Sequence, residues 1–159
     1  MDPQIKKEAL RMCTYGLYIL TCRKGAENHA TTITWVSQTS FNPPMISVSL
    51  ENQSMAYSFV RETQVFVLNI LGKGQKEIAA KFFKHPRTEG NKIGEVEFET
   101  TLTTGIPIFV PAPAYLECKA IHFLSTGDHT LVVGQIIEVG VRKKEEGLVL
   151  ATTGWSYGG

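Results

Sequence analysis

The chain has 159 residues, of which 43% are hydrophobic and 19% are charged, a composition typical of an ordered globular domain. Sixteen Lys and Arg residues against fifteen Asp and Glu residues leave a formal charge of +1, so bulk charge attracts neither nucleic acid nor anionic lipid. A chain of this length can bury most of its apolar surface without a disulfide or a structural metal. Because no segment in its middle is typical of a linker, we expect residues 1–159 to form a single domain.

The cysteines and histidines argue against cross-links and local metal sites. The chain has three cysteines, an odd number, and no C-x-x-C pair. This argues against a disulfide framework and favours a reducing compartment. The four histidines lack the short spacings of a zinc site, although a site assembled from distant residues stays open. The first residues, MDPQIKKEALRM, indicate neither a secretory signal nor a membrane span. The sequence therefore predicts a cytoplasmic protein with no metal and no membrane or nucleic-acid partner.

The first third of the chain contains one helix pattern followed by strand patterns. Asp2 and Pro3 form a cap and first-turn pair that predicts a short amphipathic helix, which we expect to lie against a sheet. Residues 15–22 are apolar at both alternating positions, as in a strand buried on both faces. Residues 30–38, ATTITWVSQ, predict a second strand, which the prolines of residues 40–44 must break.

The remaining elements are mainly strands. Strands are predicted over residues 45–51 and 65–71. Ser54 can cap a short helix, and a second short helix is predicted over residues 75–83. Residues 84–106 are polar and turn-rich and predict a long excursion with one short strand near residues 95–98.

Two long strand patterns, residues 115–124 and 129–143, are joined by a turn at residues 125–128 and predict a hairpin. The chain finishes with the short apolar run LVL and the glycine-rich tail GWSYGG. Strands without regular helix alternation favour a mainly β fold, a closed or partly open antiparallel barrel with a few short helices.

The segment TTITWVSQTSFNPP concentrates hydroxyl groups, Trp35 and a Gln before two prolines. Burying so many polar groups is costly without partners, and hydroxyls around a turn suit a ligand rich in hydrogen-bond acceptors. The alternative is that Thr31, Thr32 and Thr34 are ordinary strand residues and that residues 40–44 form an edge turn. The residue pattern alone leaves both interpretations open.

Two further residues have a functional and a structural interpretation. Ser54 begins a helix, and a helix start is a natural phosphate site, but a plain N-cap is the commoner role of such a residue. His129, beside Asp128 at a strand entrance, could contact a cofactor or a hydride donor, or be a surface turn residue. No Rossmann or Walker loop, nucleophile elbow or H-E-x-x-H motif is present, so the chain shows no catalytic machinery of its own.

Taken together, the blocks YGLYILT, TTITWVSQTSFNPPMISVSLE, Ser54, VFVLNIL, GDHTLVVGQIIEVGV and GWSYGG resemble the flavin reductase-like, FMN-binding split-barrel family, which includes flavoredoxin-like flavoproteins. The resemblance runs essentially end to end. It implies an antiparallel Greek-key split β-barrel that forms a homodimer, with non-covalent FMN or FAD near the subunit interface. It also implies NADH or NADPH as the hydride source.

The resemblance also assigns residues by matching positions. Those expected to line the flavin are Thr34, Trp35, Val36, Ser37, Ser40 and Phe41, with Ser54 near the phosphate and Phe83 or Lys84 closing the site. His129 would face the nicotinamide and is the candidate catalytic residue. The sequence departs from many members at Asn42, where they have Asp, and at His29 and Ala30, where they have a small residue.

Three functions follow as hypotheses. The first is an NAD(P)H:flavin oxidoreductase that transfers a hydride from NAD(P)H to flavin and either releases the reduced flavin or keeps it and reduces another acceptor. The second is an FMN-containing electron carrier of the flavoredoxin type, which exchanges electrons with a protein and has no pyridine-nucleotide reductase activity. The third is a β-barrel binding module without flavin.

Overall fold

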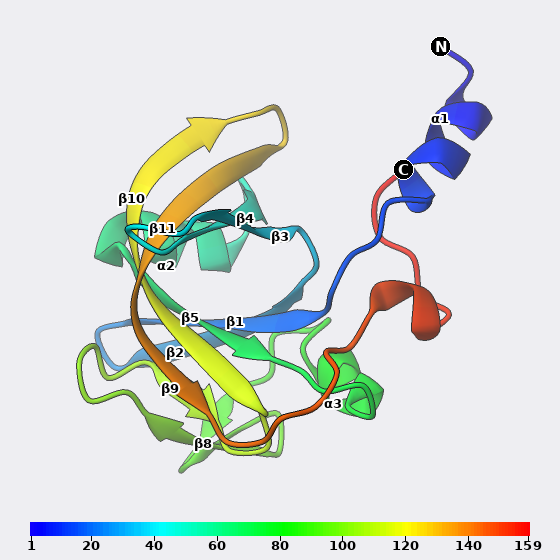
Figure 1. The fold of residues 1–159 in the computed structure, drawn as a ribbon. Helices are drawn as coiled ribbons and strands as arrows, with labels where there is room; N and C mark the ends of the chain where they lie inside the picture. The colour runs from blue at the N-terminus through cyan, green and yellow to red at the C-terminus, as the bar shows by residue number, and fades with distance from the viewer.

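Two antiparallel sheets dominate the computed structural model, which describes all of residues 1–159 (Figure 1). The larger sheet consists of β1 (Tyr18–Lys24), β2 (Glu27–Ile33), β3 (Val36–Ser40), β4 (Met45–Glu51), β5 (Val65–Ile70), β10 (Ala114–Ser125) and β11 (His129–Val141). The smaller sheet consists of β6 (Thr88–Glu89), β7 (Lys92–Ile93), β8 (Val96–Thr100) and β9 (Pro107–Phe109). The helices are α1 (Pro3–Arg11), α2 (Met55–Thr63), α3 (Lys76–Lys81) and the 3-10 turn η1 (Leu150–Thr152). This confirms a mainly β fold with antiparallel sheets and a few short helices.

The larger sheet has the strand order β2-β1-β5-β10-β11-β4-β3. Its long central hairpin, β10 and β11, is the one predicted from the sequence, and the sheet curves strongly around it (Figure 1). The edge strands β2 and β3 pair only with β1 and β4, so the sheet does not close on itself. The candidate site lies where β2 ends and the chain leaves this edge, at Thr34 and Trp35.

The prediction of one strand over residues 30–38 is wrong. Strand β2 ends at Ile33 and β3 begins at Val36, and the two strands lie at opposite edges of the sheet. Thr34 and Trp35 connect them, and Trp35 is fixed where its carbonyl accepts a hydrogen bond from the Ser49 N–H at 3.0 Å. β propensity is high on both sides of the break, so propensity alone could not reveal that the chain changes edge there.

The N-terminal helix forms but does not pack on a sheet, contrary to expectation. Asp2 caps it by accepting from the N–H groups of Gln4 and Ile5. None of its residues is buried, and α1 stands apart from both sheets beside the C-terminus (Figure 1). An amphipathic pattern shows that a helix has an apolar face, but it does not identify what covers that face.

Residues 84–106 contain more strand than predicted. The expected short strand is present as β8, but β6 and β7 precede it and form the smaller sheet with it. Asn69 of β5 connects this sheet to the larger one: its carboxamide donates to Ile19 O and Thr21 Oγ1, both at 3.1 Å, and accepts from Phe109 N at 2.8 Å. None of the helices has the length and the apolar composition that a membrane span requires.

Candidate functional site

A cavity of about 770 Å³ lies beside the Thr34–Trp35 connection of the larger sheet and is lined by 21 residues. Most of its wall comes from the end of β2 with this connection, the end of β4, the start of α2, the segment after α3, and the C-terminal tail (residues 154–159), and Leu17, His129 and Leu150 complete it. A volume of roughly 300–1,000 Å³ is usual for small-molecule sites. The cavity is therefore large enough for a ligand of nucleotide size.

The start of α2 supplies backbone hydrogen-bond donors to this cavity. Ser54 is the N-cap; its Oγ accepts from Tyr57 N at 3.1 Å and donates to Glu51 O at 2.8 Å. The next two residues, Met55 and Ala56, also line the cavity, and first-turn N–H groups have no partner within a helix. The partial positive charge of a helix N-terminus favours an anionic group there.

Two buried polar atoms at the cavity have no hydrogen-bond partner. They are Thr34 Oγ1 and Trp35 Nε1, and both residues line the cavity. Thr34 is 7% exposed, so its hydroxyl cannot rely on bulk solvent. Leaving a buried donor or acceptor unsatisfied costs about 1–3 kcal/mol, which a polar ligand in the cavity would offset. The lining therefore fits a ligand that offers both acceptors and donors.

Aromatic rings form much of the remaining wall. The Trp35 ring lies 4.7 Å from the His129 ring and 5.2 Å from the Tyr157 ring, centroid to centroid. On the tail, the Trp155 ring lies 4.8 Å from the Phe83 ring. Aromatic faces suit a planar conjugated ligand.

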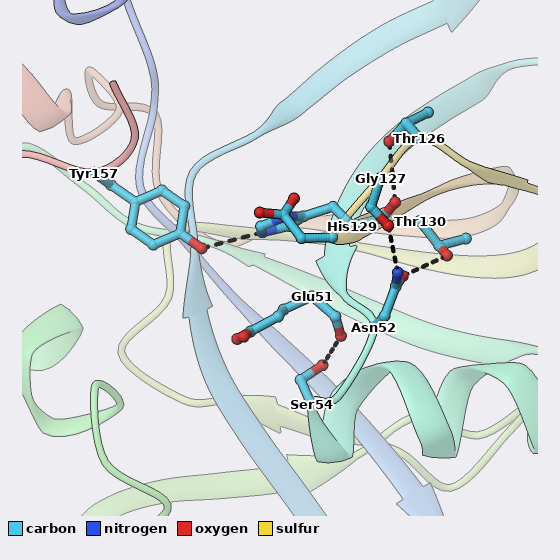
Figure 2. A network of polar contacts seen from close by, with 9 residues as sticks. Glu51, Asn52, Ser54, Thr126, Gly127, His129, Thr130 and Tyr157 are labelled. Carbon is cyan, nitrogen blue, oxygen red and sulfur yellow. Dashed lines mark hydrogen bonds and ion pairs between the residues drawn. The ribbon is translucent and has the colours of Figure 1, made fainter. Parts of the chain in front are cut away.

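A polar network joins the β10–β11 turn to the start of α2 (Figure 2). Asn52 donates to Gly127 O at 2.8 Å and accepts from Thr130 Oγ1 at 2.7 Å. In the same network, His129 contacts Asp128 through Nδ1 at 2.7 Å and Tyr157 Oη through Nε2 at 3.3 Å. These bonds fix His129 relative to the N-terminus of α2.

The cavity wall carries little formal charge. Glu51 is its one carboxylate, the two histidines are His85 and His129, and no Lys or Arg lines it. Burial raises the pKa of the Tyr157 hydroxyl, and the carboxylates of Glu51 and Asp128 raise it further. The hydrogen bond from His129 lowers the pKa of Asp128, which therefore stays ionised at neutral pH.

The structure brings five of the predicted site residues to this cavity. They are Thr34, Trp35, Ser54, Phe83 and His129.

The other predicted residues lie elsewhere. Val36 and Ser37 line a second depression of about 400 Å³ that shares Trp35 with the cavity. Ser40, Phe41 and Lys84 line neither, and Phe41, just after the edge strand β3, is 91% exposed. Contact of these five residues with a ligand stays a prediction.

Sequence reasoning missed the contribution of the C-terminal tail. Trp155, Ser156 and Tyr157 all line the cavity, as do Glu51 and His85. The available signal was two aromatic residues among the six residues of GWSYGG, which is unusual for a solvated terminus.

Comparison with known proteins gives several clear similarities. The chain is 35% identical over 146 residues to diflavin flavoprotein A 1 of Synechocystis. This match covers 91% of this chain and 25% of the relative. The chain thus spans about a quarter of that longer protein. It is 26% identical over 140 residues to an NADH:FMN oxidoreductase of Rhodococcus qingshengii, covering 88% of this chain and 71% of the relative.

A solved structure shares the fold. The NADH:FAD oxidoreductase of Streptomyces globisporus superposes with a TM-score of 0.80 at 23% identity, covering 94% of this chain and 90% of the other. The description of the matching family is "flavin reductase like domain", and the match extends over residues 10–157. The chain therefore belongs to the flavin reductase-like domain family, as its sequence resemblance indicated.

Proposed function

We propose that the chain is an FMN-binding flavoprotein that acts as an NAD(P)H:flavin oxidoreductase, with the flavin in the cavity at the start of α2. The observation that carries this proposal is the pair of unpartnered buried atoms, Thr34 Oγ1 and Trp35 Nε1, in the wall of a nucleotide-sized cavity. Membership of the flavin reductase-like family supports an oxidoreductase, and the similarity to an NADH:FMN oxidoreductase supports these substrates.

Different residues of the cavity would bind different parts of such a ligand. Ser54 and the first N–H groups of α2 would bind the phosphate. Because no Lys or Arg lines the cavity, these groups would be its main partners. Thr34 and Trp35 would bond the polar edge of the ring system, and Phe83 would cover it. A bound flavin would itself supply the capacity to accept a hydride, which explains the lack of a catalytic triad. His129 would hold its ring at the nicotinamide side.

The finer architecture and setting belong to the same proposal. The open antiparallel sheet would be a Greek-key split barrel, and two chains would form a homodimer in the cytoplasm. An exposed apolar row on β11, formed by Ile137, Val139 and Val141, supports the homodimer because exposed apolar patches are typical of interaction sites.

An electron carrier is the second candidate. The match to a quarter of a longer diflavin flavoprotein supports it, because a domain of this kind there accompanies other domains. In that case a protein would donate or accept the electrons, and neither NADH nor NADPH would reduce the flavin directly.

Steady-state oxidation of NADH and of NADPH, with and without added FMN or FAD, separates these functions. A reductase gives flavin-dependent, saturable oxidation of at least one nucleotide. Flavin binding without such turnover favours the carrier, and absence of flavin binding leaves only a flavin-free binding module.

A pair of Ser54 variants tests the location. Asp and Asn are both good N-caps, so Ser54→Asp and Ser54→Asn should fold alike. The added carboxylate should weaken FMN binding at least tenfold relative to the Asn variant, about 1.4 kcal/mol, by repelling the phosphate. Equal affinities would place the phosphate elsewhere.

A further inference from the structure

His129 is held at both nitrogens of its ring. Nδ1 lies 2.7 Å from Asp128 Oδ1, and Nε2 lies 3.3 Å from the hydroxyl oxygen of Tyr157 (Figure 2). The His129 side chain is 13% exposed, although that of Asp128 is 91% exposed. Two segments far apart in the sequence, the β10–β11 turn with the start of β11 and the C-terminal tail, thus meet at one imidazole.

These two contacts assign different roles to the two nitrogens. An ionised carboxylate can only accept a hydrogen bond, so the contact with Asp128 places the hydrogen of the neutral ring on Nδ1. Nε2 is then the atom at which the ring gains or loses a proton. A phenol hydroxyl can donate to the bare nitrogen or accept from its protonated form, so Tyr157 can bond Nε2 in either state.

Other contacts hold the tail that carries Tyr157. The Tyr157 ring packs on Trp35 at 5.2 Å, and Lys76 Nζ lies 4.9 Å from the centroid of the Trp155 ring. Gly158 has a φ of +80°, and a Cβ there would lie 3.0 Å from the Trp35 ring, so the tail fits closely at this point. The position of the hydroxyl therefore follows from the seating of the tail.

The charged groups facing this pair are few. Asp128 lies on the turn, and Glu51 of β4 is the register partner of His129. Both carboxylates act with burial to raise the pKa of Tyr157, so its hydroxyl keeps its proton over the neutral range. Tyr157 therefore acts as a neutral hydrogen-bond partner, not as a phenolate.

We propose that Tyr157 is a positioning residue, which holds His129 with Nδ1 on Asp128 and keeps Nε2 at the cavity wall as the atom that carries the exchangeable proton. The role of this proton rests on the proposed function, in which the nicotinamide and the flavin meet near His129. The arrangement of the His129 ring does not depend on the proposed function, because the contacts that hold it lie within the chain.

The ring is tested first without any ligand. Nitrogen-15 NMR of the neutral His129 ring, assigned with His129→Asn, should show hydrogen on Nδ1. In Asp128→Asn this preference should be lost, since an amide can also donate. In Tyr157→Phe the tautomer should stay, but the Nε2 resonance should move because its partner is gone. Tyr115→Phe, a tyrosine outside the cavity, should leave the resonance in place.

Turnover provides the second measurement. Tyr157→Phe keeps the ring on Trp35 and removes only the hydroxyl, so FMN affinity and the KM for NADH should stay at wild-type values. The kcat should fall about 2- to 10-fold, the equivalent of one hydrogen bond of 0.5–1.5 kcal/mol.

Two results would overturn the inference. One is hydrogen on Nε2 in the neutral wild-type ring, and the other is a Tyr157→Phe enzyme that matches Tyr115→Phe in both kcat and Nε2 resonance. If FMN fails to bind the wild-type chain, the proposed function fails, and the NMR result alone then decides how His129 is held.

Discussion

Thr34 carries a buried hydroxyl group that costs the fold stability unless a ligand bonds to it. The residue lies in the connection between β2 and β3, and its hydroxyl has no partner in the protein. Strand statistics explain a Thr at this position but not a buried unsatisfied hydroxyl. The proposed ligand would account for it by accepting from or donating to this oxygen.

His29 makes stability depend on pH. Burial, and then the nearby charge of His85, lower its pKa to about 4. Between this pH and the ordinary histidine pKa of about 6.5, the unfolded chain binds a proton at this residue that the folded chain does not. The free energy of unfolding should therefore fall as the pH drops from about 6.5 to 4, by on the order of 3 kcal/mol at most from this group.

Urea unfolding of wild type and His29→Leu at several pH values checks this. The variant should show a flatter pH dependence between pH 6.5 and 4, while His122→Asn, an exposed histidine, should follow wild type. Parallel curves for wild type and His29→Leu would mean that His29 is not the group responsible.

At the scale of elements, Asn69 is the polar interruption in an otherwise apolar strand. Asn69→Leu removes three hydrogen bonds and leaves the buried Phe109 N–H without a partner. Stability should fall by about 1–3 kcal/mol in urea unfolding. Asn91→Ala, at an exposed position, should change it by no more than about 0.5 kcal/mol. A stable Asn69→Leu variant would show that the two sheets do not depend on this bridge.

The same elements show how far the sequence could lead. The β10–β11 hairpin, the β4 and β5 strands and the Ser54 cap were predictable because periodicity and capping are local signals. The break at Thr34 and Trp35 was not, because the residues on both sides favour strands and only long-range pairing separates them. The sequence also could not show that α1 packs on neither sheet, because its pattern gives an apolar face but not the partner of that face.

At the scale of the whole molecule, the cavity unites segments from residue 17 to residue 157. Matching positions made Thr34, Trp35, Ser54, Phe83 and His129 site candidates, and all five line the cavity. Glu51, His85 and the tail residues line it too, but sequence reasoning missed them because their place in the wall depends on tertiary packing.

The exposed row on β11 leads to a prediction about assembly. Wild-type protein should sediment as a dimer, and Val139→Lys combined with Val141→Lys should sediment as a monomer because charges disfavour burial of this face. Lys144→Glu, an exposed charge change outside the strand, should leave the dimer intact. A monomeric wild type would rule out the homodimer.

The central claim, that the unpartnered groups of the cavity exist to bind flavin, is tested most directly by FMN titration of wild type and Thr34→Val. The substitution keeps the shape and removes only the hydroxyl. We predict saturable FMN binding to wild type and about 2- to 10-fold weaker binding to the variant, together with unchanged or higher stability in urea. Equal FMN affinity in both proteins, or no saturable binding to either, would contradict the account.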